Sequence, residues 1–252
     1  MLPSDFPEVQ DHPTLKRLLQ NFVDPYVLDL RTLLGLPEHV AGNCAFTAAG
    51  ALLNLIAGTS VCLFDADAEA LHGRGDRGRR FRELLQQYYP WQEEGIVPSQ
   101  GSDLLYESAR NPMAHSLGLD TPPTAGAGKQ MAVTKPRLTD EHVLELEDSA
   151  TRPAWLPATV EIARPAYGAD EVVVSVPALY RGIHQMLRRL LADAKQAADA
   201  DALAVLFRPL WDKVVHETVS FRDEFAVVSR RCECGTELVS PDGGQNWRCP
   251  RC

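Results

Sequence analysis

The sequence has no excess of basic residues, and this absence limits the classes of protein it can belong to. Its 25 Lys and Arg residues stand against 34 Asp and Glu residues, which gives a formal net charge of -9. A protein that coats DNA without sequence preference neutralises many phosphates with Lys and Arg, so this charge argues against such a role. Only 5 of the basic residues are lysines, and the other 20 are arginines. Because the planar guanidinium suits bidentate phosphate contacts, local arginine-rich patches keep a nucleic-acid partner open.

The sequence also lacks the motifs of several common enzyme and targeting classes. It has no glycine-rich phosphate loop of the nucleotide-binding kind and no Gly-x-Ser-x-Gly elbow. His216-Glu217 has no second histidine four residues after the first, so it is not a zinc-protease helix. Residues Met1 to Pro7 have no basic region that leads into an apolar stretch, so we expect no secretory signal and a cytoplasmic location.

The length and composition favour a folded protein with one large domain and a small appendage. With 252 residues, 45% hydrophobic and 23% charged, the chain is close to the average for soluble globular proteins. This composition argues against a disordered, collagen-like or disulfide-dense chain. Four of the six cysteines lie within the last 21 residues. We therefore predict a large domain at 1–228 and a small C-terminal domain at 229–252.

Apolar residues recur at helical spacing through most of the first 120 residues and again after residue 176. The stretch from Val40 to Phe64 is about long enough to span a membrane. Its many Gly, Asn, Thr and Ser residues indicate instead a helix buried in the protein core. Pro177 suits the first turn of a helix that runs to about Ala198. Further helices are expected before and after Pro25, over Phe81–Tyr89, over Asp103–Arg110 and around Leu203–Val215.

The middle of the chain has a different character. Residues 121–136 are crowded with Pro and Gly and predict a flexible connection. Three short segments rich in Val, Leu and Ile follow, and such segments are typical of strands in a small antiparallel sheet. They are His142–Glu147, Ala158–Ala163 and Glu171–Val176. The predicted fold class is therefore mainly α, with a small antiparallel β insertion at about 137–176.

The cysteines near the C-terminus are spaced like metal ligands. They form two pairs, Cys232/Cys234 and Cys249/Cys252, which are separated by 14 residues. Two tight turns that face each other across a hairpin can place four thiolates around one Zn2+ ion, and Asp242-Gly243-Gly244 is a credible hairpin tip. The segment resembles a zinc ribbon, although its first pair is separated by one residue where ribbons usually have two.

Two disulfides or four unligated thiols are the competing interpretations of these cysteines. Disulfides are disfavoured without an export signal, and unligated thiols would be prone to oxidation. We expect one structural Zn2+ per chain, because all four ligand positions would be filled by the protein. Metal binding should supply much of the folding free energy of so short a segment. Cys44 and Cys62 lie in the apolar helix and are expected to be small core residues.

An arginine and a histidine close together in the sequence mark a candidate catalytic site. Arg110-Asn-Pro-Met-Ala-His115 follows a predicted apolar helix. Because proline disfavours helical geometry at the residue before it, we expect the helix to break at Asn111 and to restart. The backbone N–H groups of a restarted helix attract anions, and Arg110 could clamp the same phosphate. The similarly spaced pair Arg137/His142 is interpreted as a chance match in strand-like, acidic sequence.

The arginine, the polar residue after it and His115 resemble the signature of the HEPN superfamily. The resemblance extends, as a pattern of amphipathic helices, over roughly residues 10–220. HEPN proteins are up-and-down helical bundles, and many are metal-independent endoribonucleases in which two protomers bring their Arg/His pairs together. The resemblance therefore implies an RNA substrate, a homodimer and a role as a toxin or antiviral defence effector. An inhibitor or activator protein would be a further partner of such an effector.

Carried onto this sequence, the resemblance implies a role for each residue of the motif. His115 would be the general acid/base around the 2′-hydroxyl and the leaving 5′-oxygen, and its ordinary pKa of about 6.5 suits both tasks. Arg110 would stabilise the charged phosphorane, and Asn111 would orient the site. Two alternatives stay open. Arg110 could pair with an acid such as Glu107 while His115 lies in the core, and the protein could be a non-catalytic adaptor whose helical domain and ribbon bind nucleic acid or protein.

The most basic stretch of the chain is a candidate RNA-binding segment. Arg74, Arg77, Arg79 and Arg80 are the predicted phosphate contacts, with Arg82 beyond them in the same stretch. A solvated loop is an equally good interpretation. Tyr88, Tyr89 and Trp91 could stack on bases, but packing against a neighbouring helix is favoured.

Overall fold

The computed structural model describes residues 2–10, 13–37, 44–63, 78–116, 130–164 and 170–196, and the strands at 229–231 and 237–239. The chain separates into two compact units, Met1–Phe207 and Arg208–Cys252. The sequence-based boundary between residues 228 and 229 stays a prediction. The helix expected around Leu203–Val215 lies outside the described residues.

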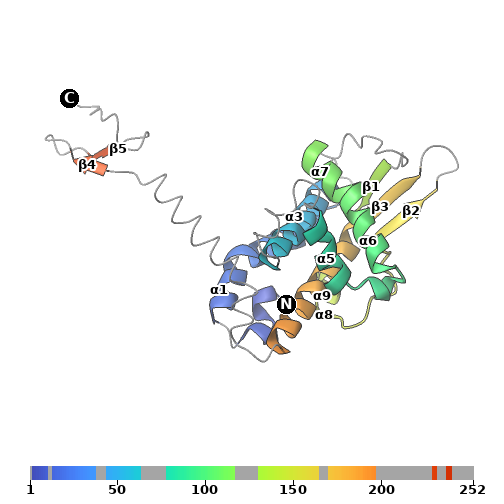
Figure 1. Ribbon diagram of the computed structural model, residues 1–252, viewed down its shortest axis with the longest axis horizontal. Coiled ribbons are helices and arrows are strands. Elements are labelled where there is room, and N and C mark those ends of the chain that lie inside the picture. The colour runs from blue at the N-terminus through green and yellow to red at the C-terminus, as the bar shows by residue number, and fades with distance from the viewer. Residues whose placement is uncertain are drawn as a thin grey trace. The chain divides into compact units, whose positions relative to one another are not determined.

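The first unit is mainly helical with one small sheet, as the sequence predicts (Figure 1). Its helices are α1 (Pro13–Phe22), α2 (Asp24–Gly35), α3 (Ala45–Leu63), α5 (Arg79–Tyr88), α6 (Pro98–Leu105), α7 (Asn111–Ser116), α8 (Asp140–Asp148) and α9 (Val176–Gln196). Short 3-10 turns are η1 (Pro3–Asp5), η2 (Pro7–Val9) and η4 (Trp91–Glu94), and a π turn, η5 (Tyr106–Arg110), joins α6 to α7.

Helices α3, α5 and α9 pack against one another and form the core of this unit. The predicted buried helix at 40–64 is confirmed as α3, in which Leu52 and Ile56 are fully buried. None of the described helices combines the length and apolar character of a membrane span. Cys44 lies one residue before α3 rather than within it and is half-buried, whereas the side chain of Cys62 is outside the described residues.

Helix α9 has the apolar face that the sequence predicts. It begins at Val176, one residue before Pro177, where a missing N–H costs no helical hydrogen bond. All six apolar residues of the predicted face are buried: Leu179, Ile183, Met186, Leu187, Leu190 and Leu191. This face recurs every three or four residues, as a helix that packs on a core requires.

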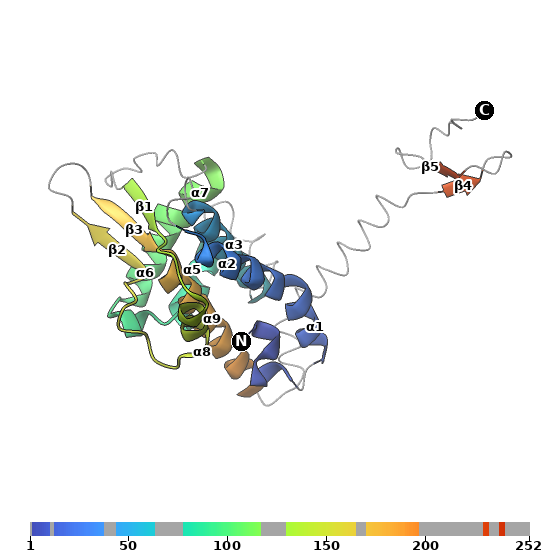
Figure 2. The ribbon, with the colours of Figure 1, turned by 180° about the vertical axis from the view of Figure 1, so that it is seen from behind.

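The sheet has the strand order β1-β3-β2 and is mixed rather than antiparallel. Strands β2 (Val160–Ala163) and β3 (Glu171–Ser175) pair antiparallel and confirm two of the predicted strands. Strand β1 (Gln130–Thr134) pairs with β3 in parallel, because α8 and β2 lie between them in the chain and allow a crossover. The three strands lie together at one end of the unit, beside α6 and α7, in both views (Figures 1 and 2).

The prediction of a flexible connection over 121–136 is wrong at its C-terminal end. Residues 130–134 form β1, which pairs over its whole length with Glu171–Ser175. The sheet therefore begins before residue 137, the expected start of the insertion. The rest of the predicted connection, up to residue 129, lies outside the described residues.

The predicted strand at His142–Glu147 is also wrong, since these residues belong to α8. Thr139 caps this helix by accepting a hydrogen bond from the His142 N–H, and the His142 ring accepts one from the Thr139 N–H. Such reciprocal caps fix a helix start, and the acidic first turn complements the helix dipole. Val143, Leu146 and Glu147 are buried at helical spacing. The His142 ring is thus used to cap α8. The pair Arg137/His142 does not lie in a strand as expected, and its interpretation as a chance match stays a prediction.

Candidate active site

The candidate site forms where one long helical segment changes its pitch. Helix α6, the π turn η5 and α7 follow one another without interruption from Pro98 to Ser116. The Asn111 N–H donates to the Tyr106 carbonyl oxygen, five residues back, as a π turn requires. In a regular α-helix the Pro112 ring would clash with the Ser108 carbonyl. The wider turn relieves this clash, and π turns of this kind are frequent at functional sites.

The expected break at Asn111 is therefore wrong. Asn111 has helical backbone angles, with φ -66° and ψ -48°, and its N–H is already used within the π turn. It is the first residue of α7 and does not act as a cap. The backbone N–H groups of a restarted helix, which were expected to attract a phosphate, are not presented here. Any attraction for an anion has to come from side chains.

Arg110 supplies such a side chain. It is half-buried, and its guanidinium carbon lies 5.8 Å from the centre of the Tyr106 ring. Among the residues that the structure describes, no carboxylate lies within ion-pair distance of Arg110. The alternative partner, Glu107, is taken by Arg82, whose Nη1 lies 3.3 Å from Glu107 Oε1. Within the described ranges, the charge of Arg110 thus faces an aromatic ring and no carboxylate.

For His115 the structure describes the position of the backbone alone. It belongs to α7, and its side chain lies outside the described residues. Residues 111–116 are α-helical, so positions 110 and 115 are about 140° apart around the helix axis. The two residues lie about 1.4 turns apart in one continuous helical segment but on different faces of it.

The predicted arginine contacts divide into three groups. Arg74 and Arg77 lie outside the described residues. Arg79 is exposed and pairs with Glu83, with 2.5 Å between Nε and Oε1. Arg80 is only 7% exposed, and this burial weighs against a phosphate contact.

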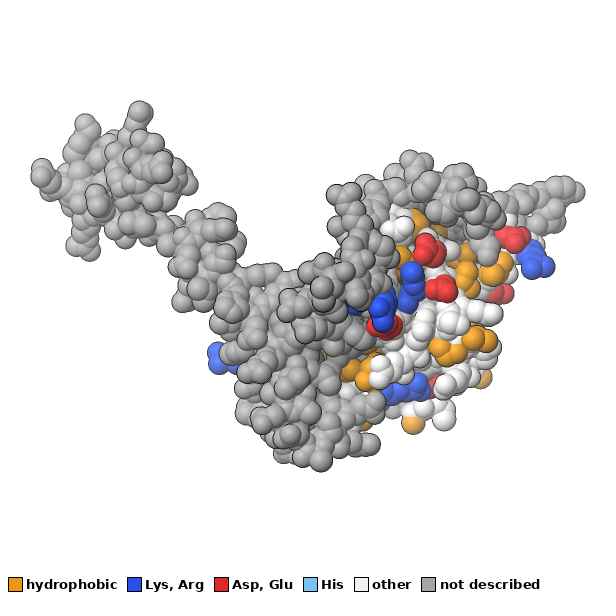
Figure 3. Space-filling view, in the orientation of Figure 1, with side chains coloured by type: hydrophobic (Ala, Val, Ile, Leu, Met, Phe, Trp, Pro, Cys, Tyr) orange, Lys and Arg blue, Asp and Glu red, His pale blue; other side chains and the backbone are white. Residues whose placement is uncertain are grey.

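Arg82 is a residue of this region that the sequence-based list of RNA contacts omits. Its Nε lies 3.2 Å from Asp103 Oδ1, and its guanidinium carbon lies 4.5 Å from the centre of the Tyr106 ring. Arginine and acidic side chains accordingly gather over α5 and α6 on the face shown in Figure 3. The long sequence separation between Arg82 and its partners left no local signal of these contacts.

Gly78 brings the end of the arginine stretch against the candidate site. A Cβ atom at this position would overlap with the Tyr106 ring and would lie 2.7 Å from Arg82 Nη1. The arginine stretch therefore enters α5 directly beside the Tyr106 ring, which also contacts Arg110. Two segments that are about 30 residues apart in the sequence meet here.

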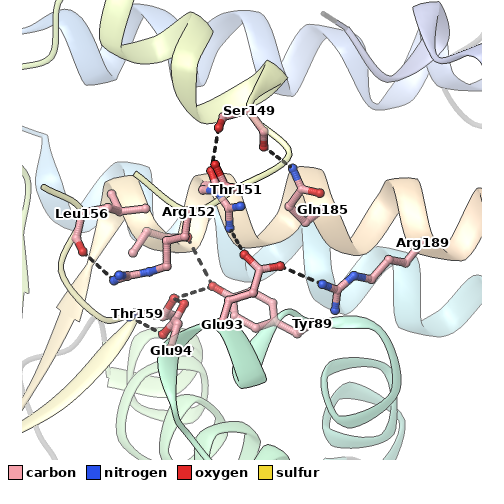
Figure 4. A network of polar contacts seen from close by, with 12 residues as sticks. Tyr89, Glu93, Glu94, Ser149, Thr151, Arg152, Leu156, Thr159, Gln185 and Arg189 are labelled. Atoms are coloured by element: carbon pink, nitrogen blue, oxygen red, sulfur yellow. Dashed lines mark hydrogen bonds and ion pairs between the residues drawn. The ribbon is translucent and has the colours of Figure 1, made fainter. Parts of the chain in front are cut away.

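The aromatic residues after α5 pack in the interior, as favoured from the sequence. Tyr89 is 3% exposed and Trp91 is fully buried, and their ring centres are 4.3 Å apart. The Tyr89 hydroxyl bonds to Thr159, which donates its N–H and its hydroxyl to the Glu94 carboxylate, both at 2.7 Å (Figure 4). Burial raises the pKa of the Tyr89 hydroxyl and of the Glu94 carboxyl. This network fastens η4 to the sheet and is not open to a base.

A second buried network joins α2, α8 and α9. The Arg31 guanidinium donates two hydrogen bonds, of 2.7 and 2.6 Å, to the fully buried Glu147 carboxylate, and the Tyr180 hydroxyl donates a third of 2.5 Å. Burial alone raises the pKa of Glu147, but hydrogen bonds that include those from Arg31 and Tyr180 outweigh burial and lower it to about 2. His184 packs against Tyr180 and is 1% exposed, and burial lowers its pKa to about 4.

The cysteines of the predicted zinc site, Cys232, Cys234, Cys249 and Cys252, lie outside the described residues. In the second unit, strands β4 (Ser229–Arg231) and β5 (Glu237–Val239) pair antiparallel. Their five-residue connection contains the first cysteine pair. Elsewhere in the described part of the chain, no three or more His, Cys, Asp and Glu side chains are grouped to hold a metal ion.

No protein-family model, curated protein or solved structure matches the chain.

Proposed function

We propose that this protein is a metal-independent endoribonuclease of the HEPN type, cytoplasmic and active as a homodimer. One observation carries the proposal. A π turn ends at Arg110, in the helix that also contains Asn111 and His115, and holds the arginine over Tyr106 without a carboxylate partner among the described residues. A guanidinium without a carboxylate partner can bind a phosphate, to which it donates two parallel hydrogen bonds.

The proposed reaction assigns each residue of the motif a task. His115 removes the proton of the RNA 2′-hydroxyl or delivers one to the leaving 5′-oxygen. Arg110 stabilises the negative charge that develops on the phosphorane, and Asn111 orients the scissile group. The chemistry needs a 2′-hydroxyl, so RNA is cut and DNA is spared. A role as a toxin or antiviral effector, held in check or triggered by a partner protein, is part of the same proposal.

The helix geometry supports a site that two chains complete. Backbone positions 110, at the end of η5, and 115, in α7, are about 140° apart around the helix axis, which favours a site that takes one of the two residues from each chain. In a symmetric dimer the same surface of each chain faces its copy. We infer that Arg110 of one chain and His115 of the other contact the same phosphodiester.

The second unit is proposed to be a zinc ribbon that recruits RNA or a protein partner. The antiparallel pairing of β4 with β5 supports it, because Cys232 and Cys234 belong to the five residues between these two paired strands, and zinc ligands come in pairs that are close in sequence. Cys249 and Cys252 would supply the other two thiolates of a structural Zn2+.

A non-catalytic adaptor is the second candidate function. The continuity of the helix from Pro98 to Ser116 favours it, because Arg110 and His115 then lie on different faces. In that case the arginine side chains over α5 and α6, together with Arg110, would bind a nucleic acid or protein without cleaving it.

Incubation of the purified protein with single-stranded RNA in EDTA separates the two functions. The proposal expects cleavage that persists without metal and that falls by about a hundredfold to ten-thousandfold in His115→Ala. His142→Ala is the matched control, since this histidine caps α8 and packs against Trp155, away from the motif, and its loss should leave cleavage unchanged. An adaptor would bind the RNA and leave it intact in all three proteins.

A further inference from the structure

Arg82 pairs with two acidic side chains beside the candidate site. Its guanidinium contacts Asp103 Oδ1 at 3.2 Å and Glu107 Oε1 at 3.3 Å, and it covers the Tyr106 ring at 4.5 Å. We propose that Arg82 is a positioning residue, which keeps the Arg110 guanidinium available to an RNA phosphodiester by holding Glu107 away from it. This inference rests on the proposed function.

Glu107 is the competitor because of its place in the helical segment. It precedes Arg110 by three residues, a separation over which the side chains of a helix can form ion pairs. Its side chain is 54% exposed, so it can change rotamer and pair with either neighbouring arginine. In the structure it pairs with Arg82 and not with Arg110.

Arg82 retains Glu107 because several groups fix its guanidinium. Asp103 and Glu107 are four residues apart, on successive turns of the α6–η5 segment, and Arg82 bridges them from α5. The Tyr106 ring lies against the guanidinium, and the Arg82 side chain is only 28% exposed. An arginine ordered in this way loses little side-chain freedom per contact.

Tyr106 connects the two arginines. Arg82 lies 4.5 Å and Arg110 lies 5.8 Å from the centre of the same ring. Arg82 thus pairs with the two carboxylates, while Arg110 contacts the ring and, in the part of the chain that the structure describes, forms no ion pair. The sequence has six arginines from residue 74 to residue 110. Two of them, Arg82 and Arg110, have different surroundings and are proposed to have different tasks.

A merely structural role for Arg82, as a staple between α5 and α6, makes a different prediction. If Arg82 only fastened α5 to α6, its loss would weaken RNA binding whether or not Glu107 kept its charge. Replacing Glu107 as well would then not restore the binding. In the proposed role RNA binding weakens because the freed Glu107 carboxylate pairs with Arg110. Neutralising Glu107 should therefore restore RNA binding.

The test compares wild type with Arg82→Gln, Arg82→Gln/Glu107→Gln and Arg82→Gln/Asp103→Asn. Binding of a single-stranded RNA oligonucleotide is measured, and thermal unfolding checks that each variant is folded. Arg82→Gln should weaken RNA binding by about twofold to fivefold, as expected for a gained surface ion pair at Arg110. Glu107→Gln should restore it. Asp103→Asn removes the same charge seven residues from Arg110 and should restore little.

A second readout needs no RNA. The Arg110 Nε–H resonance in NMR spectra should shift and exchange more slowly in Arg82→Gln, as an arginine does on pairing with a carboxylate, and should return in the Glu107→Gln double variant. An unchanged resonance in Arg82→Gln, or equal recovery of RNA binding in both double variants, would overturn the role of Arg82. If the resonance behaves as expected but no RNA binds to any protein, the positioning holds and the proposed function fails.

Discussion

Arg110 and Tyr106 lie four residues apart in one π turn, with the guanidinium carbon 5.8 Å from the centre of the ring. An aromatic face attracts a cation without neutralising its charge. Arg79 and Arg82 nearby are instead opposed by carboxylates. Of these three arginines, Arg110 is therefore the one whose charge is available to an anionic ligand.

The buried histidine of α9 predicts how stability depends on pH. Burial lowers the pKa of His184 to about 4, and an unfolded histidine has a pKa of about 6.5. Between these values the unfolded state binds a proton that the native state does not, so the free energy of unfolding falls as the pH is lowered. We expect a loss of about 2 kcal/mol between pH 7 and pH 5 from this residue. Urea unfolding at the two pH values measures it.

His184→Leu is the variant that isolates this effect. Neither ring nitrogen of His184 has a hydrogen-bond partner in the described structure, so an apolar side chain of similar size should not destabilise the protein at pH 7. The stability loss on going to pH 5 should shrink in the variant by the His184 contribution. An equally steep loss in both proteins would show that another group causes it.

Gly182 allows Tyr89 to approach α9. A Cβ atom at this position would overlap with the Tyr89 ring and its hydroxyl, and Tyr89 is held in place by Thr159. Gly182→Ala should therefore lower the free energy of unfolding by about 1–3 kcal/mol. Gly58→Ala, at an exposed position of α3 where a Cβ meets nothing within 4 Å, should instead raise it by about 0.5–1 kcal/mol. Equal effects of the two variants would contradict the close contact between Gly182 and Tyr89.

The proposed ribbon predicts one equivalent of zinc per chain in freshly purified protein, measured by elemental analysis. Cys234→Ser should lose the metal, whereas Cys44→Ser, outside the ribbon, should keep it. Because metal binding supplies much of the folding free energy of a short segment, chelation should make residues 229–252 sensitive to protease. Protein that contains no zinc when isolated under reducing conditions would rule the ribbon out.

The elements that follow from local sequence signals were predictable. The apolar face of α9 and the proline near its start are local features, and the structure confirms both. Helix α8 also has a local signal, the cap between Thr139 and His142, but the density of Val and Leu suggested a strand. The acidic first turn and the three-to-four spacing of Val143 and Leu146 were the better guide.

Other features depend on contacts that no local pattern encodes. Strand β1 lies in a segment crowded with Pro and Gly and is a strand because it pairs with β3, whose partner residues lie 41 positions further on in the sequence. The π turn is a response to Pro112 within a helix that continues beyond it, whereas sequence rules favoured a break. The pairing of Arg82 with Glu107 joins residues 25 apart, so the candidate site could be located from the sequence but its electrostatics could not.

The central claim is that Arg110 of one chain and His115 of the other act on one phosphodiester. It is tested most directly by mixing two inactive variants, Arg110→Ala and His115→Ala, in equal amounts under conditions that exchange subunits. A mixed dimer then holds one intact site, so RNA cleavage in EDTA should recover to about a quarter of the wild-type rate. A mixture that cuts RNA no faster than either variant alone would contradict the claim.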